Sequence, residues 1–270
     1  MPLEPKRPSH WEDTKAQVIS AQHMRRGVGW LAILLPVLTA VGYWLFGAQR
    51  GGFLGSISES YYTLMRDVFV GTLCIEAFFL YAYRGYSAFE DRFFNGLAVL
   101  CVAIALFSVN SKPVVAAVAA PPPCHYSIEM YPTCLIVLND RVLMSHHEAF
   151  GWIHIVAAAI LFASLGYVSI GFFTKTDRAE PGLEKRRRNT IYRVAGSAIW
   201  SALALYGLFL AAQKLAPEAA WVRTLDDWPF LFAVETVCLF AFGFSWLVKG
   251  DGVYGLSDPP MQGTSGSPQQ

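Results

Sequence analysis

The feature that most restricts what this chain can fold into is a long apolar run without a charged residue at positions 27–47, directly after Arg25 and Arg26. At about 1.5 Å of helical rise per residue, a run of this length crosses the roughly 30 Å hydrocarbon core of a bilayer. It is too long for the apolar core of a signal peptide, and no clean small-x-small cleavage site follows it. We therefore expect residues 27–47 to form a first transmembrane helix that is kept in the mature protein.

Five further apolar runs follow, each bounded by charged residues or by Pro and Gly. They cover residues 62–83, 93–110, 147–173, 193–213 and 228–248. The composition agrees, because only 15% of the residues are charged, against about 25% in a typical soluble domain. The predicted fold class is an all-α, polytopic membrane helix bundle with about six transmembrane helices, which fill residues 27–250.

The basic residues are divided unevenly between the two sides that six spans define. If residues 1–26 are a cytoplasmic N-terminal segment, 14 of the 21 basic residues lie inside and 6 lie outside, with Arg193 left out because it begins the fifth span. Positively charged loops stay in the cytoplasm, so both termini are predicted to be cytoplasmic in a multi-pass protein of the bacterial inner (plasma) membrane. The tail at residues 251–270 is rich in Gly, Ser, Pro and Gln and is expected to be disordered.

The net charge of +1 gives the chain no general field for nucleic acid. Membrane lipids are the expected partners, together with a second copy of the chain or another subunit of a membrane complex. No nucleic acid partner is expected.

The longest connection, residues 111–146, is predicted to lie outside. It contains a proline-rich stretch at 113–123 and two short apolar runs around Asn139 and Asp140 that favour a small hairpin. It also contains Cys124 and Cys134, whereas the other three cysteines stand inside apolar runs. An extracytoplasmic compartment is oxidising, so we expect a Cys124–Cys134 disulfide, with two free thiols as the alternative.

Ionisable side chains inside a bilayer are costly, by about 2.5–3.5 kcal/mol at a helix centre, so each one needs a reason. The topology above puts Asp67, His154 and Glu235 in the outer half of the membrane, and they are the candidate catalytic residues. Glu76 falls nearer the cytoplasmic half and is expected to be a separate residue. The alternative for each is an isolated, hydrogen-bonded core group.

The residues around these three are candidates for binding a ligand. They are polar and lie next to the outer ends of the spans; the set is Ser58, Glu59, Tyr61, Arg66 and His147. His147 and His154 share one helix face, but about 10.5 Å of helical rise separates them, so they cannot hold one metal ion. We therefore expect no metal site and no cofactor. Arg66 and His147 have a plainer alternative, as a charge at the lipid–water boundary and as a solvated helix start.

Several short motifs carry a resemblance to known families: residues 56–63 (SISESYYT), 65–71 (MRDVFVG), 154–162 (HIVAAAILF), 188–193 (RNTIYR) and 242–250 (FGFSWLVKG). Together they resemble an uncharacterised group of bacterial six-span membrane proteins. The Ile-Ser motif before the second span and the His-led fourth span are similar to the DRAM/Sfk-type membrane proteins. Ser58 or Ser60, together with Asp67 and His154, also resembles the intramembrane set of the CREST membrane hydrolases, which include alkaline ceramidases. The seventh span, a second-span His and a late HxxxH of that superfamily are missing here.

The sequence leaves four functions open. The first is an outward-facing polar pocket that binds a lipid head group or a small solute. The second is an intramembrane lipid hydrolase with His154 as base, Asp67 or Glu235 as its orienting partner and a serine or water as nucleophile. The others are a proton-coupled transporter that uses Glu76 and Glu235, and a membrane scaffold or complex subunit without a site.

Overall fold

The computed structural model describes residues 10–46, 53–85, 87–107, 109, 147–175 and 182–250. In these ranges it contains seven α-helices and no strand, which confirms the all-α class. The α-helices are α1 (His10–Phe46), α2 (Arg66–Ala82), α3 (Ala88–Leu106), α6 (His147–Tyr167), α7 (Leu183–Leu215), α8 (Ala220–Asp227) and α9 (Phe230–Lys249). A 3₁₀ segment, η2 (Ile57–Tyr62), precedes α2, and a π-helical turn, η5 (Val168–Phe172), continues α6.

Four of the described helical segments are long and apolar enough to cross a membrane: Ala21–Phe46, Phe150–Phe172, Leu183–Leu215 and Phe230–Lys249. Their length and composition are those of a multi-pass integral membrane protein. The other two long helices, α2 and α3, do not meet the same measure, so four of the six predicted spans are supported in the described residues. α2 has 17 residues, and the first turns of α3 carry Glu90, Asp91 and Arg92.

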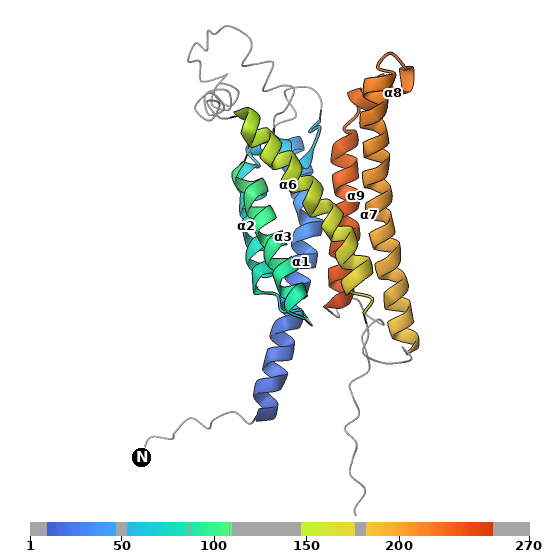
Figure 1. Ribbon diagram of the computed structural model, residues 1–270. Coiled ribbons are helices and arrows are strands. Elements are labelled where there is room, and N and C mark those ends of the chain that lie inside the picture. Colours follow the sequence, from blue (N-terminus) through green and yellow to red (C-terminus); the bar gives the residue numbers. More distant parts are fainter. Residues whose placement is uncertain are drawn as a thin grey trace, which may run out of the picture.

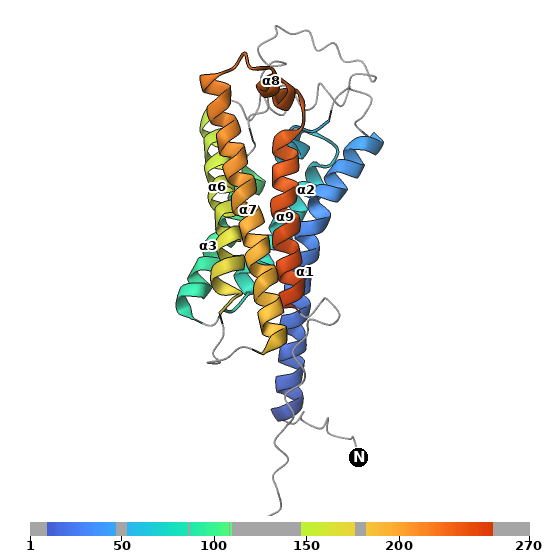
Figure 2. The same cartoon turned by 90° about the vertical axis from the view of Figure 1, so that its right-hand side faces the viewer.

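The long helices run alternately up and down and form one bundle (Figure 1). α1 packs against α9, α2 against α3, and α9 also against α7. The first part of α1 continues beyond the bundle, and the short helix α8 lies at the opposite end, beside the end of α7 (Figures 1 and 2). We call the end of the bundle at which η2 lies and α2 starts the η2 end. The opposite end, where α2 and α9 finish, is the far end.

Two helices extend beyond the predicted spans. α1 begins at His10 inside the segment 1–26, and α7 begins at Leu183 rather than at residue 193. The charged residues Lys185–Arg188 are good helix formers, so the helix continues past the point where the apolar run ends. The predicted outer loop 111–146, with its hairpin and both loop cysteines, and the tail 251–270 lie outside the described residues.

The contact between α1 and α9 depends on two glycines. A Cβ atom added to Gly29 would lie 2.7 Å from the carbonyl oxygen of Gly243, and one added to Gly243 would lie 2.6 Å from the carbonyl oxygen of Gly29. Small residues let helix backbones approach closely, which is how helices associate where no water is available to drive them together. The two glycines therefore bring α9 next to α1.

Aromatic and basic residues gather at the far end. Trp246 is fully buried, and its ring packs edge-on against Tyr83 and Phe173 at centroid distances of 5.0 and 5.1 Å. Next to them, Arg26 Nε donates a hydrogen bond of 2.7 Å to the carbonyl oxygen of Gly250. Lys175 Nζ lies 2.6 Å from the buried Glu90 carboxylate. Charged contacts here join α1 to the end of α9, and the segment after η5 to the first turn of α3.

Candidate functional site

The η2 segment is a short polar turn that is held in place by its own side chains. Ser56 caps it, because its hydroxyl accepts the backbone N–H of Glu59 at 3.3 Å. The Glu59 carboxylate in turn accepts the backbone N–H of Gly55 at 2.8 Å. A serine cap with an acid three residues later satisfies N–H groups that a helix start leaves without partners. The sequence 55–59 thus forms a compact turn rather than an open loop.

Helix α9 holds this turn from one side. Glu235 is buried, and its Oε2 accepts the backbone N–H of Ile57 at 2.6 Å. One turn earlier, the backbone N–H of Phe232 donates to the carbonyl oxygen of Gly55 at 2.9 Å. The acid that the sequence places inside the last apolar run is therefore a partner of the η2 main chain.

Helix α6 holds the same turn from another side. His154 is 3% exposed, and its Nε2 lies 2.9 Å from the hydroxyl oxygen of Ser58. Its Nδ1 lies 2.6 Å from the carbonyl oxygen of Phe107, at the end of α3. A carbonyl oxygen only accepts, so Nδ1 carries the proton in a neutral ring, and Nε2 accepts the Ser58 hydroxyl proton. The imidazole is thereby fixed in one tautomer and one orientation.

Two more polar groups lie in this turn. Ser60 is fully buried, and its hydroxyl has no hydrogen-bond partner among the described residues. Arg66 donates a hydrogen bond of 3.0 Å to the Tyr61 hydroxyl, and its guanidinium lies 4.5 Å from the centre of the Tyr61 ring. The turn therefore holds a buried hydroxyl with no partner among the described residues, and Arg66, the first residue of α2, is bound to the turn through Tyr61.

The structure brings some of the predicted site residues together and separates others. His154 and Glu235 bind neighbouring residues of η2, namely Ser58 and Ile57. Asp67 is exposed on the first turn of α2, and no described contact joins it to His154 or Glu235. His147 begins α6, but its side chain lies outside what the structure describes. In the described part of the chain, no group of three His, Cys, Asp or Glu side chains is placed to hold a metal ion.

Sequence reasoning missed two partners in this cluster. The Ile57 N–H and the Phe107 carbonyl are main-chain groups, which no side-chain pattern identifies. Ser60 was named only as an alternative to Ser58 in the resemblance to the CREST hydrolases, and its full burial was not predicted. The sequence did contain one signal of this cluster, which is the high number of hydroxyl side chains between residues 56 and 63, directly before an apolar run.

No protein-family model matches this chain, and neither a curated protein nor a solved structure is significantly similar to it.

Proposed function

We propose that the chain crosses a bacterial inner membrane six times with both termini in the cytoplasm, and that its η2 end faces outward and binds the polar head group of a lipid or a small solute. The alternating direction of α1, α2, α3, α6, α7 and α9 supports six crossings (Figure 1). The basic residues support the orientation, because Arg26 and Lys175 make their contacts at the far end, which would then be cytoplasmic.

The observation that carries the binding site is the hydrogen bond between His154 and Ser58. Polar groups buried at membrane depth are rare and tend to mark functional sites. Here the His154 imidazole and the Glu235 carboxyl bind the same turn through Ser58 and Ile57, and the hydroxyl of Ser60 in that turn has no partner among the described residues. These groups offer both donors and acceptors to a hydroxyl, amine or phosphate of a head group.

Access to the site depends on movement of η2. Ser58, Ser60 and His154 are all buried, so a ligand reaches them only when the turn shifts away from α6 or α9. The connections to be broken are the hydrogen bonds to His154 and Glu235. The turn then acts as both a wall of the site and its cover.

Ser60→Ala gives the sharpest test of binding, because it removes a hydroxyl with no described protein partner. Protein is reconstituted in nanodiscs of phosphatidylethanolamine, phosphatidylglycerol and cardiolipin, and the lipids that stay bound after detergent extraction are measured by native mass spectrometry. The wild type and the control Ser201→Ala, on the exposed face of α7, should retain a polar lipid. Ser60→Ala and His154→Asn should lose most of it. Equal retention in all four proteins would exclude this site.

A lipid hydrolase is the second candidate, favoured by the orientation of the Ser58–His154 pair. A hydroxyl hydrogen-bonded to the free nitrogen of an oriented imidazole is the arrangement of an activated nucleophile. His154 Nε2 would accept the Ser58 proton while Oγ attacks an ester or amide carbonyl, and the proton would then pass to the leaving group. A fluorophosphonate probe tests the hydrolase candidate. It should label the wild-type protein at Ser58 and leave the Ser58→Ala and His154→Asn variants unlabelled.

Two further readings have less support from the described contacts. If the chain is a scaffold without a binding site, neutral replacement of His154 and Glu235 should not change the amount of lipid that stays bound. A proton-coupled transporter would need Glu76 and Glu235 to exchange protons. The Glu235 carboxyl accepts the Ile57 N–H, whereas the Glu76 carboxyl has no hydrogen-bond partner among the described residues.

A further inference from the structure

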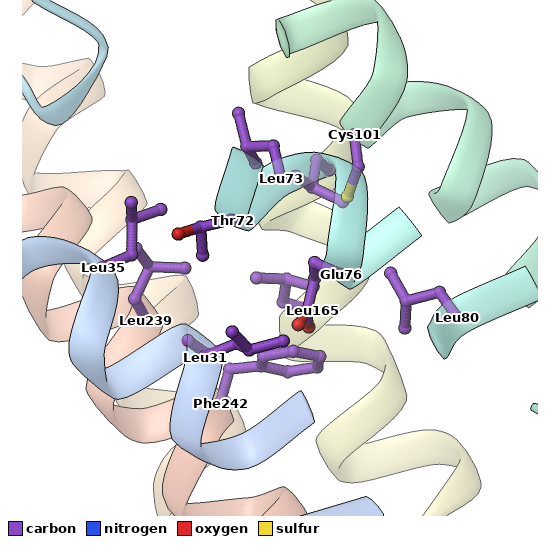
Figure 3. A pocket seen from close by; sticks show the side chains of 12 residues that line it. Leu31, Leu35, Thr72, Leu73, Glu76, Leu80, Cys101, Leu165, Leu239 and Phe242 are labelled. Carbon is purple, nitrogen blue, oxygen red and sulfur yellow. The ribbon is translucent and has the colours of Figure 1, made fainter. Parts of the chain in front are cut away.

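A second site lies in the middle of the bundle, away from η2. A partly open cavity of about 40 Å³ lies between α1, α2, α3, α6 and α9. Its walls are mostly leucines, with Phe242 on α9 and Cys101 on α3 (Figure 3). A water needs roughly 10–15 Å³ of such volume. The space therefore accepts about three waters or one equally small solute.

Among the described residues that line this cavity, Glu76 is the only acidic or basic one, and it is 8% exposed. Neither of its carboxyl oxygens has a hydrogen-bond partner among the described residues. Figure 3 shows these oxygens turned toward the space that Leu31 and Phe242 also line. A buried carboxylate without a partner is strongly unfavourable, so Glu76 either takes up a proton or binds a positive or hydrogen-bonding guest in the cavity.

The walls restrict what that guest can be. Thr72 stands one turn before Glu76 on the same face of α2, and these two supply the oxygen atoms of the lining side chains. Calcium and magnesium need about six oxygen ligands, so neither ion fits. An alkylammonium fits better, because its N–H groups donate to Glu76 and Thr72 while its short alkyl body contacts the leucines. The ring of Phe242 also favours a cation.

We propose that this cavity is a binding site for a small alkylammonium ion, with Glu76 as its counter-charge. The site is independent of the η2 site, since its lining shares no residue with the Ser58–His154–Glu235 cluster. A compound that binds the folded protein raises its unfolding temperature in a saturable way. The unfolding midpoint of the full-length protein in detergent micelles, followed by the fluorescence of its 8 tryptophans, therefore reports binding.

The probe is n-propylammonium chloride, and its matched controls are n-propanol, which has the same length without the charge, and sodium chloride. In the wild type, the midpoint should rise saturably with n-propylammonium and stay unchanged with sodium chloride. n-Propanol should give less than half of the rise. Glu76→Gln should lose the response, and the exposed control Glu218→Gln should keep it.

Leu161→Phe provides a second, independent variant, because it fills the cavity and leaves Glu76 in place. It should lose the response even if Glu76→Gln does not yield folded protein. Three results would overturn the proposal: no rise in the wild type, an equal rise with n-propanol, or a full response in Glu76→Gln or Leu161→Phe. An unresponsive wild type would leave Glu76 as a carboxyl that binds only a proton.

Discussion

The imidazole of His154 and the hydroxyl of Ser58 lie 2.9 Å apart although 96 positions separate them in the chain. Both side chains are buried, so the hydrogen bond connects α6 to η2 inside the bundle and is screened from water. Glu235 makes the corresponding connection from α9 to the neighbouring residue, Ile57. The η2 turn is thereby held between two helices that are far apart in sequence.

If Ser58 and His154 act as a pair, their substitutions should not add. Ser58→Ala and His154→Asn each leave a buried polar group without its partner, which costs about 1–3 kcal/mol of unfolding free energy. The double variant should cost less than the sum of the two. Unfolding by denaturant in mixed micelles measures this, with Ser201→Ala on the exposed face of α7 as a control within about 0.5 kcal/mol of the wild type. Additive losses would mean that the two residues act separately.

Glu235 should be replaceable by glutamine but not by leucine. The amide oxygen of Glu235→Gln can still accept the Ile57 N–H, whereas Glu235→Leu leaves that N–H buried without a partner, a loss of about 1–3 kcal/mol. Hydrogen–deuterium exchange of the segment 53–63 reports the difference. We expect slow exchange in the wild type and in Glu235→Gln, and faster exchange in Glu235→Leu. The same exchange rate in all three would show that this bond does not hold the turn.

The α1–α9 contact predicts opposite effects for two glycine substitutions. Gly243→Ala puts a methyl group against the Gly29 backbone, which must then move, so it should destabilise the protein by about 1–3 kcal/mol. Gly207→Ala is the matched control, because a Cβ at Gly207 has no neighbour within 4 Å. It should be neutral or stabilise α7, since alanine favours a helix by about 1 kcal/mol over glycine. Thermal unfolding of the two variants side by side tests the contact.

The apolar runs predicted the helices well because hydropathy alone places a chain in a membrane. The same signal ends where charges begin, which is why the charged start of α7 at Leu183 and the short helix α8 were not foreseen. For the site, the choice of His154 and Glu235 followed from the cost of burying them. Their actual partners, Ser58 and the N–H of Ile57, depend on how η2 folds into the bundle, and helix periodicity contains no information about a loop.

Cys124 and Cys134 are predicted to form a disulfide if the loop at residues 111–146 lies in an oxidising compartment. Unreduced protein, denatured and treated with a maleimide, should label at Cys74, Cys101 and Cys238, which are free thiols. Reduction should add Cys124 and Cys134. Mass spectrometry of the peptides shows which cysteines carry the maleimide before and after reduction. Labelling of both Cys124 and Cys134 before reduction would rule out the disulfide.

In the proposed orientation, the η2 end, with Ser58, His154 and Glu235, faces away from the cytoplasm. Leu64 and Leu183 are both exposed and lie at opposite ends of the bundle, next to η2 and at the start of α7. Single cysteines are placed at these positions in a chain whose native cysteines are replaced, and spheroplasts are treated with a membrane-impermeant maleimide. We predict that Leu64→Cys is labelled in intact spheroplasts and Leu183→Cys only after permeabilisation. The reverse pattern would mean that the η2 end faces the cytoplasm, and it would contradict the proposed orientation.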